Sequence, residues 1–267
     1  MASNELMCGR FSLLAIANLA VCVAVVFASA GCGGEGDSNV NTQTWPYAAM
    51  GDSLAVGVLA STGYVPRYQQ HVQDDTGANV VLTNLGVNGW RSSDLLLALR
   101  SDARFRAAVR TAQIVTWDIG GNDLRAVRNE FISGTCGGAD NQECLRQAVA
   151  QFKTNWDAIV SEILSLRDPR STVLRTMDIY NPFVDLDRIS NRFGVLNSYL
   201  NETNAYITAS AARNNILCAK VHEAFNGASG EDPVAKGLIS VDHLHPNDRG
   251  HEAIATAFRN LGYAPLR

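Results

Sequence analysis

The feature that most constrains the fold is a set of short apolar runs that recur along the chain. Each run has the length of a strand and is rich in β-branched residues. The five runs are WPYAAMG (45–51), NVVLTNLG (79–86), QIVTWDIG (113–120), STVLRTMDIY (171–180) and NNILCAKVH (214–222). Strands of this kind, alternating with helices, predict a parallel sheet that is covered on both faces.

The segments between these runs carry the 3.6-residue spacing of amphipathic helices. The clearest pattern spans residues 144–167, where apolar residues recur at i, i+3 and i+4 until an Asp-Pro pair ends it. Further patterns cover about 190–213 and 247–261. We therefore expect an α/β fold of three layers, with a five-stranded parallel sheet between helices, as one domain over residues 45–267.

Composition and charge narrow the class of partner. The chain has 267 residues, of which 46% are hydrophobic and 18% charged, which is enough to form a full core. The formal net charge is −4, and lysines and arginines are scattered along the chain. Nucleic-acid binding needs a basic patch, which this sequence lacks. We expect a small-molecule substrate and no nucleic acid.

The first 31 residues differ from the rest of the chain. An uncharged apolar run, FSLLAIANLAVCVAVVFASA, follows Arg10, and small residues follow the run. This arrangement predicts an export signal. A run of this length can also span a bilayer, but no basic stop-transfer cluster comes after it, so the export signal is the favoured interpretation.

Two cleavage sites fit this export segment. ASA at 28–30 matches ordinary secretion, while SAGC at 29–32 resembles a bacterial lipobox, whose cysteine is lipidated after cleavage. The polar stretch behind Cys32 has the composition of a flexible tether. We favour a lipoprotein signal peptide over 1–31, a lipid anchor on Cys32 and a tether over 32–44. The protein is then expected at the bacterial cell envelope, held on the membrane, with secretion as the alternative.

The remaining cysteines are interpreted in the same export compartment, which is oxidising. Cys136 and Cys144 flank the loop GGADNQE, and we expect them to form a disulfide. Cys218 lies in an apolar run and is expected to be a buried free thiol. No cysteine pair has zinc-ligand spacing, and His251 lacks the second histidine of an HExxH motif, so no metal site is predicted.

Polar, glycine-rich words follow the first three predicted strands. They are GDSL (51–54), NLGVNG (84–89) and GGND (120–123), and a fourth word, DHLHP (242–246), precedes the last predicted helix. Each word alone is typical of a turn. In parallel α/β sheets, however, ligands bind at the carboxyl ends of the strands, so the joint occurrence of these words indicates a functional site.

Taken together, the four words resemble the sequence blocks of the GDSL, or SGNH, hydrolases, a family of serine esterases and lipases. The resemblance spans about residues 45–260. It implies a flavodoxin-like α/β/α sandwich and ester hydrolysis through an acyl-serine intermediate, without a cofactor. The sequence has no G-x-S-x-G elbow, and its serine follows the first strand, which argues against the α/β-hydrolase fold.

Carried onto this chain, the resemblance implies Ser53 as the nucleophile, His245 as the general base and Asp242 as the carboxylate that orients it. The chemistry asks for these residue types, because a serine hydroxyl needs a base and the imidazole needs an acceptor on its other nitrogen. The implied oxyanion donors are the backbone N–H groups of Ser53 and Gly89 and the side-chain amide of Asn122.

Some assignments within these words have alternatives. Gly86 is the alternative to the later glycine of its word, and His243 is the alternative to the later histidine of DHLHP. Trp90 and Arg91 stand where small or polar residues are common in the family, and we expect them to shape the acyl or alcohol pocket.

Other functions are compatible with the same residues. An acyltransferase, a thioesterase, a phospholipase or a carbohydrate deacetylase uses the same site and differs in its pocket and in water access. A non-catalytic, surface-anchored binding protein is the alternative from a different class, because a fold does not guarantee an activity. The sequence leaves the natural substrate and the oligomeric state open.

Overall fold

A computed structural model describes residues 43–267. At its centre is a five-stranded sheet in the order β2-β1-β3-β4-β5, in which every neighbouring pair is parallel. The strands are β1 (Thr44–Met50), β2 (Asn79–Asn84), β3 (Ile114–Trp117), β4 (Val173–Met177) and β5 (Leu217–Ala219). Each falls on one of the apolar runs, so the predicted sheet is confirmed.

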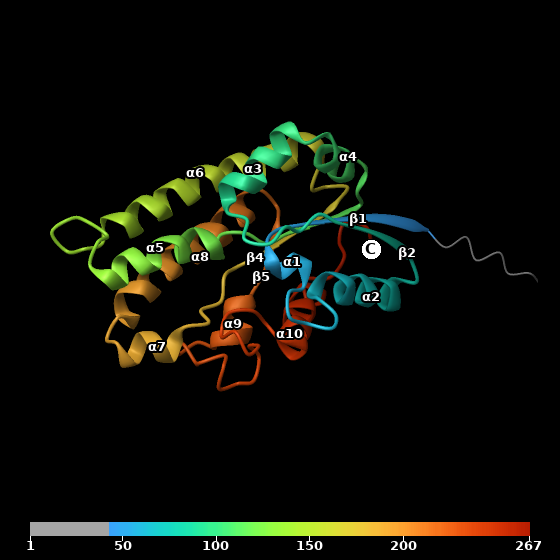
Figure 1. Cartoon of the computed structure of the whole chain (residues 1–267). Helices are drawn as coiled ribbons and strands as arrows, with labels where there is room; N and C mark the ends of the chain where they lie inside the picture. Colours follow the sequence, from blue (N-terminus) through green and yellow to red (C-terminus); the bar gives the residue numbers. More distant parts are fainter. Residues whose placement is uncertain (1–42) are drawn as a thin grey trace, which may run out of the picture. The chain divides into compact units, whose positions relative to one another are not determined.

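Helices cover both faces of the sheet (Figure 1). They are α1 (Ser53–Val56), α2 (Tyr64–Thr76), α3 (Ser92–Ser101), α4 (Ala103–Thr111), α5 (Gly121–Ser133), α6 (Glu143–Leu166), α7 (Val184–Ile189), α8 (Phe193–Arg213), α9 (Val221–Asn226) and α10 (Asp248–Arg259). In Figure 1, α3, α4, α6 and α8 lie on one side of the sheet, and α2, α9 and α10 lie on the other.

Two hydrophobic cores correspond to these two faces. Because side chains alternate along a strand, Tyr47 and Ala49 of β1 pack into the core with α2 and α10, whereas Ala48 and Met50 pack into the core with α3 and α6. The central strands β1, β3 and β4 are therefore buried on both faces, as their continuous apolar runs predict, whereas the edge strands β2 and β5 keep exposed residues.

The helices expected from apolar spacing are present as α6, α8 and α10. The stripe of α6 buries Phe152 and Trp156 against the sheet, and the helix ends before the Asp-Pro pair. The start of α10 is capped by Asn247, whose side chain accepts the backbone N–H groups of Arg249 and Gly250.

The strands are shorter than the apolar runs that predict them. In the run 214–222, Asn215 turns the chain with a φ of 55° after α8, and Val221 begins α9. β5 therefore keeps only Leu217–Ala219. Apolar residues at the end of a run can serve the next helix, so a run sets the position of a strand better than its length.

The strand order reverses at β1, and the polar words meet at the carboxyl ends of the strands. β1 lies between β2 and β3, so the chain leaves β1 to one side and later returns on the other. Ligands of open α/β sheets bind at such a switch point, beyond the carboxyl ends of the strands. Ser53 follows β1 and Asn122 follows β3, so both lie at the carboxyl ends of neighbouring strands.

The expected export segment (1–31), Cys32 and all but the last two residues of the expected tether lie outside the described residues. These assignments stay predictions. Thr44, expected to end the tether, is instead the first residue of β1. Among the residues that the structure describes, no helix has both the length and the apolar composition needed to cross a membrane.

Candidate active site

Ser53 stands at the sharp turn between β1 and α1. Gly51 has a φ of 150°, and Asp52 caps α1 because its carboxyl group accepts the N–H of Leu54 at 2.9 Å. The helix ends after one turn, where Gly57 takes the left-handed conformation. This turn holds Ser53 at the first helical position with only 9% of the residue exposed.

His245 and Asp242 continue a hydrogen-bond chain from the serine. His245 Nε2 lies 2.9 Å from Ser53 Oγ, and His245 Nδ1 lies 2.5 Å from Asp242 Oδ2. Burial raises the pKa of Asp242, but hydrogen bonds from the His245 side chain and from the N–H groups of His245 and Leu244 outweigh it and hold that pKa below its ordinary value. An ionised Asp242 keeps the proton on Nδ1, so Nε2 can accept the serine proton.

The loop that carries both residues is closed on itself. Ile239 and Pro246 form an isolated antiparallel bridge, and the N–H of Ser240 donates to the carbonyl of His245 at 2.7 Å. Asp242 and His245 therefore stand on one short, internally bonded loop.

The same loop is tied to the end of the sheet. The hydroxyl of Tyr180, behind β4, donates to the carbonyl of Leu244 at 2.7 Å. His243 is exposed and has a φ of 57°. The histidine that contacts Ser53 is therefore His245, the later histidine of the word.

Asn122 lies in the first turn of α5 and lines the same pocket as Ser53. Its Nδ2 donates to the carbonyl of Trp90 at 2.9 Å and to Asp52 Oδ2 at 3.1 Å. Its Oδ1 accepts hydrogen bonds from Arg125. The amide is thus oriented from both ends, and it can serve an oxyanion only if one of its two acceptors competes weakly.

The two candidate glycines have different structural roles. A Cβ at Gly86 would lie 2.7 Å from the Cβ of Ala55, so this glycine lets the chain after β2 pack closely on α1. Gly89 has a φ of 78°, which requires glycine, and space around it is open. No partner for the Gly89 N–H is found within the described part of the chain, so this group can donate to a ligand.

Trp90 and Arg91 do not line the pocket at Ser53, which corrects the sequence-based expectation. The ring of Trp90 packs on Phe105 of α4, with ring centroids 5.4 Å apart. The backbone N–H of Arg91 donates to the Asp94 carboxylate at the start of α3. Both residues serve the packing and capping of the helical layer.

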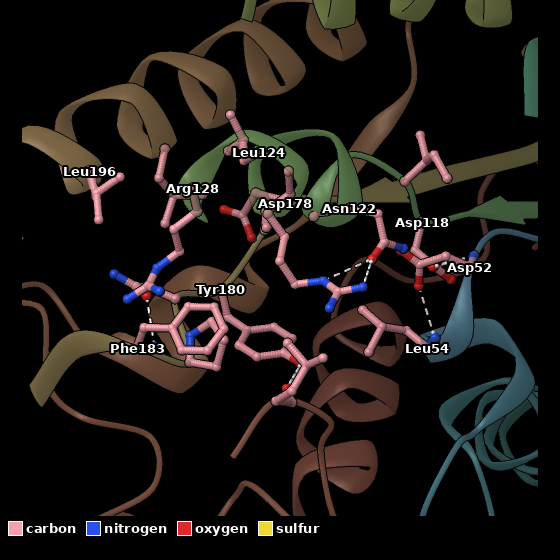
Figure 2. Close-up of a pocket in the computed structure, with 18 of the residues that line it drawn as sticks. Asp52, Leu54, Asp118, Asn122, Leu124, Arg128, Asp178, Tyr180, Phe183 and Leu196 are labelled. Carbon is pink, nitrogen blue, oxygen red and sulfur yellow. Dashed lines mark hydrogen bonds between the residues drawn. The ribbon is translucent and has the colours of Figure 1, made fainter. Parts of the chain in front are cut away.

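The pocket at Ser53 runs between α5, α8 and the segment behind β4. Figure 2 shows Asp52 and Leu54 at one end and Arg128 and Phe183 at the other. Eleven of the 24 lining residues have apolar side chains: Leu54, Ile119, Leu124, Leu145, Met177, Ile179, Pro182, Phe183, Leu196, Leu200 and Leu244. Walls of this composition suit an apolar part of a substrate.

An ion pair contributes to the lining of the pocket, and its arginine, Arg128, lies at the end away from Asp52 (Figure 2). Arg128 pairs with Asp187, whose side chain is 2% exposed, and the guanidinium lies 4.3 Å from the centre of the Phe183 ring. Burial raises the pKa of Asp187, and the charge of Arg128 opposes this rise. The sequence words give no sign of this pair.

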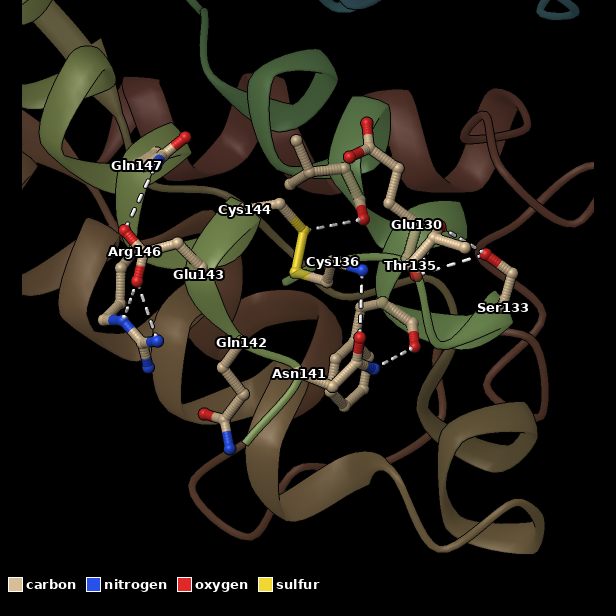
Figure 3. The surroundings of a disulfide bond; sticks show 12 residues. Glu130, Ser133, Thr135, Cys136, Asn141, Gln142, Glu143, Cys144, Arg146 and Gln147 are labelled. Atoms are coloured by element: carbon tan, nitrogen blue, oxygen red, sulfur yellow. Dashed lines mark hydrogen bonds and ion pairs between the residues drawn. A yellow bond between two sulfur atoms is a disulfide. The ribbon is translucent and has the colours of Figure 1, made fainter. Parts of the chain in front are cut away.

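Cys136 and Cys144 form a disulfide between the loop behind α5 and the start of α6 (Figure 3). Asn141 braces the loop, because its side chain accepts the N–H of Cys136 and donates to the carbonyl of Phe131. Leu145, next to Cys144, lines the pocket. The disulfide therefore fixes one wall of the pocket at a distance from Ser53.

Two buried groups beside Ser53 are missed by the motifs. Asp118 Oδ1 accepts the N–H of Asp52 at 3.1 Å, and Asp118 Oδ2 accepts the hydroxyl of Tyr64 at 2.5 Å. A Cβ at Gly51 would lie 2.5 Å from the Asp118 carboxyl group, so this carboxyl explains the glycine. The available sign in the sequence is Asp118 itself, an ionisable residue at the end of an apolar run.

Two further histidines and the remaining described cysteine lie away from Ser53. His251 is buried and accepts the N–H of Tyr64, and burial lowers its pKa to about 4. His71 contacts Glu252. Cys218 is unpaired but only half-buried, a correction to the expected full burial, and desolvation raises its pKa to about 12. In the described part of the chain, no three acidic, histidine or cysteine side chains form a metal-binding cluster.

A known protein family matches most of the described chain. A model of the GDSL-like lipase/acylhydrolase family matches residues 49–253. The chain belongs to this family. The match contains Ser53, Asn122, Asp242 and His245, and it assigns the protein to the carboxylic ester hydrolases.

Curated relatives match along most of the chain. The spore germination lipase LipC of Bacillus licheniformis is 24% identical over 228 residues, which cover 84% of this chain and 99% of that protein. The protein YpmR of Bacillus subtilis is 29% identical over 215 residues, which cover 78% of this chain and 77% of YpmR.

Solved structures share the fold. The lipase Lip_vut3 from a goat rumen metagenome aligns with a TM-score of 0.71 at 23% identity and covers 85% of this chain and 100% of its own. The acetylxylan esterase Axe2 of Geobacillus stearothermophilus aligns with a TM-score of 0.60 at 17% identity over 85% of this chain and 99% of its own. These likenesses confirm the expected SGNH-type α/β/α sandwich.

Proposed function

We propose that the protein hydrolyses carboxylic esters through an acyl-serine intermediate, with Ser53 as nucleophile, His245 as general base and Asp242 as its orienting carboxylate. The supporting observation is the hydrogen-bond chain from Ser53 Oγ through His245 to Asp242, next to an apolar pocket. A serine hydroxyl becomes a competent nucleophile when a positioned base takes its proton.

In the acylation step, His245 Nε2 takes the proton of Ser53 Oγ while this oxygen attacks the ester carbonyl. Negative charge develops on the carbonyl oxygen, and the N–H groups of Ser53 and Gly89 and the amide of Asn122 stabilise it. His245 then donates its proton to the alcohol oxygen as the ester C–O bond breaks, and the acyl group stays on Ser53.

In the deacylation step, a water molecule replaces the alcohol. His245 takes a proton from the water while the water oxygen attacks the acyl-serine carbonyl. His245 then donates this proton to Ser53 Oγ as the carboxylic acid leaves. The nucleophile, the base and the oxyanion donors are all groups of this chain. We therefore expect chelators to leave the activity unchanged.

We propose aliphatic acyl groups as the preferred part of the substrate. The apolar walls begin beside Ser53, and Arg128, which is half-buried and pairs with the buried Asp187, lies toward the other end. A chain that reached this ion pair would have to desolvate it or displace it, which is costly. Activity is therefore expected to rise with acyl length to an optimum and then to fall.

The test is the hydrolysis of p-nitrophenyl esters from acetate to palmitate by the full chain, beside a Ser53→Ala variant. We expect Ser53→Ala to lower turnover by a factor on the order of 10⁴ to 10⁶. Ser93→Ala, at an exposed serine of α3, is the control and keeps wild-type activity. A fluorophosphonate probe is expected to label the wild type and the control only. A Ser53→Ala variant with over a tenth of wild-type activity would refute the assignment.

We further propose that the protein is exported and held at the bacterial cell envelope by a lipid on Cys32. The support is the sequence of the N-terminal segment alone. Labelling of the full chain with a palmitate analogue in a bacterial host tests it. We expect label in the wild type and in Cys22→Ser, and none in Cys32→Ser. An unlabelled wild type would favour cleavage at 28–30 and secretion.

A further inference from the structure

Beneath Ser53, two carboxyl groups share a buried site, and no cation pairs with them. Asp52 is 4% exposed and Asp118 is 1% exposed; we call these two residues the acid pair. In the described part of the chain, no lysine or arginine forms a salt bridge with either of them. The acid pair is instead held by neutral donors, which are the N–H of Leu54, the amide of Asn122 and the hydroxyl of Tyr64.

Two desolvated carboxyl groups in contact cannot both ionise near neutral pH. Burial, followed by the charge of Asp118, raises the pKa of Asp52 well above its usual value, and burial raises the pKa of Asp118 to about 6. Asp118 accepts the N–H of Asp52 and the hydroxyl of Tyr64. These donors favour the negative charge on Asp118 and therefore the proton on Asp52.

The charge of Asp52 matters because Asp52 contacts an oxyanion donor. Its Oδ2 accepts the Nδ2 group of Asn122 at 3.1 Å. Hydrogen bonds to an ionised acceptor are roughly twice as strong as those to a neutral one. An ionised Asp52 would therefore retain this N–H and place a negative charge beside the developing oxyanion, whereas a neutral Asp52 competes weakly for it.

We propose that Asp52 works as a neutral carboxylic acid, whose proton is shared with Asp118, and that this neutrality leaves the Asn122 amide available to the oxyanion. Asp52 and Asp118 are positioning residues, because they act through Asn122 and do not touch the substrate. The proposal rests on the proposed ester hydrolysis. It assigns the loss of turnover at alkaline pH to the ionisation of Asp52.

Other titratable groups face the acid pair from the surrounding elements. They are Tyr47 of β1, Tyr64 of α2, Tyr180 behind β4 and His245 of the catalytic loop. Burial raises the pKa of each tyrosine well above its usual value, so all three stay neutral through the working range. His245 acts as the general base and does not share the buried site of the acid pair.

Replacement of Asp52 by asparagine tests the proposal. The amide has the shape of the protonated acid and cannot ionise. Its oxygen can accept the N–H of Leu54 and its N–H can donate to Asp118, while the hydrogen bond from the Asn122 amide to Asp52 Oδ2 is lost. We expect Asp52→Asn to keep turnover at neutral pH within about threefold of the wild type and to lack the alkaline decline. Asp74→Asn, at an exposed carboxylate of α2, is the control and keeps the wild-type pH profile.

Two results with Asp52→Asn overturn the proposal. A loss of more than about tenfold in turnover at neutral pH, with the fold intact, means that the charged form of Asp52 is the working one. An alkaline decline identical to that of the wild type means that another group causes it. Turnover and KM measured against pH for one short ester separate these results.

Asp118→Asn gives a second test with a shift in the opposite direction. The variant removes the negative charge that opposes the ionisation of Asp52, so Asp52 ionises more easily. We expect the alkaline decline of turnover to move to lower pH by about one unit or more. If the wild type shows no decline in its stable range, the variant is expected to introduce one. Damage that is only structural lowers turnover at every pH, and a profile that does not move overturns the proposal.

Infrared difference spectroscopy gives a readout without catalysis. At neutral pH, we expect the wild type to show the C=O band of a protonated carboxylic acid, which Asp52→Asn lacks. The absence of this band in the wild type overturns the proposal. This result needs only the wild type, so it holds even when the variant does not fold. A wild type without serine-dependent esterase activity would defeat the proposed hydrolysis, whereas an active wild type with unmoved variant profiles would defeat the shared proton alone.

Discussion

Two aspartates near Ser53 have opposite surroundings. The side chain of Asp242 is 31% exposed and contacts His245, and its hydrogen bonds hold its pKa below the ordinary value. Asp52 is 4% exposed and contacts Asp118, and burial raises its pKa. The surroundings, rather than the residue type, therefore set the charge of a carboxyl group. The same side chain can orient a base as an anion or leave an amide available as a neutral acid.

The largest expected difference between the two aspartates comes from replacing Asp242 by asparagine. An amide can donate to Nδ1 of His245 and hold the imidazole in the tautomer whose Nε2 carries the proton. We expect Asp242→Asn to lower turnover by a factor on the order of 10⁴, against about threefold for Asp52→Asn at neutral pH. Turnover of the two variants on one ester, measured side by side, checks this. Equal losses would contradict the contrast between them.

A smaller loss of turnover is expected when the side-chain amide of Asn122, which contacts Asp52, is removed. Asn122→Ala deletes one side-chain donor, and we expect turnover to fall by a factor on the order of 10² to 10³, with KM changing less. Asn201→Ala, at an exposed asparagine of α8, is the matched control. An Asn122→Ala variant with more than half of the wild-type turnover would exclude this amide as an oxyanion donor.

The far wall of the pocket is expected to affect stability more than chemistry. Cys136 and Cys144 are 8 residues apart, and closing a loop of this size stabilises by about 2.5 kcal/mol in the chain-entropy account. We expect the double serine variant to lose a free energy of unfolding of this order while it hydrolyses acetate esters at close to the wild-type rate. Denaturant unfolding and turnover measure the two effects. A large loss of turnover at unchanged stability would be the contrary result.

The smallest effect is a pH dependence of stability. Asp118 has a pKa of about 6 in the folded protein and about 3.9 when unfolded. Between these values the folded state holds a proton that the unfolded state has lost, so this carboxyl group stabilises below about pH 4 and the contribution is lost as the pH rises through about 6. Compared with Asp118→Asn, the wild type is expected to lose on the order of 2 kcal/mol between about pH 4 and pH 7. A constant difference in unfolding free energy would contradict the raised pKa.

The sequence predicts the sheet well and the smaller helices poorly. Buried parallel strands need continuous apolar runs, which stand out in any sequence. Of the helices, α6 and α10 have clear apolar stripes, whereas α5 has no fully buried residue and α4 buries only Phe105 and Val109. A helix without a wide apolar stripe gives no periodic pattern from which its bounds could be predicted.

The same limit applies to the site. Ser53, Asn122, Asp242 and His245 stand in recognisable words, but their use as catalytic groups stays a prediction. Tyr64 and Asp118 are 54 residues apart, and Arg128 and Asp187 are 59 residues apart. Their contacts are products of the fold, and each residue alone resembles an ordinary surface or core side chain. The expectation for Trp90 and Arg91 failed because residue order does not give the direction of a side chain.

The closed loop between Ile239 and Pro246 has a consequence for the loss of activity on heating. It carries Asp242 and His245 together, whereas Ser53 belongs to the turn behind β1. Opening the loop would move Asp242 and His245 together away from Ser53 while the sheet stays folded. Such a local fluctuation costs less free energy than global unfolding. Heat is therefore expected to silence the enzyme reversibly below its melting temperature, and the amide of Ser240, which donates to His245, would exchange with deuterium as it does so.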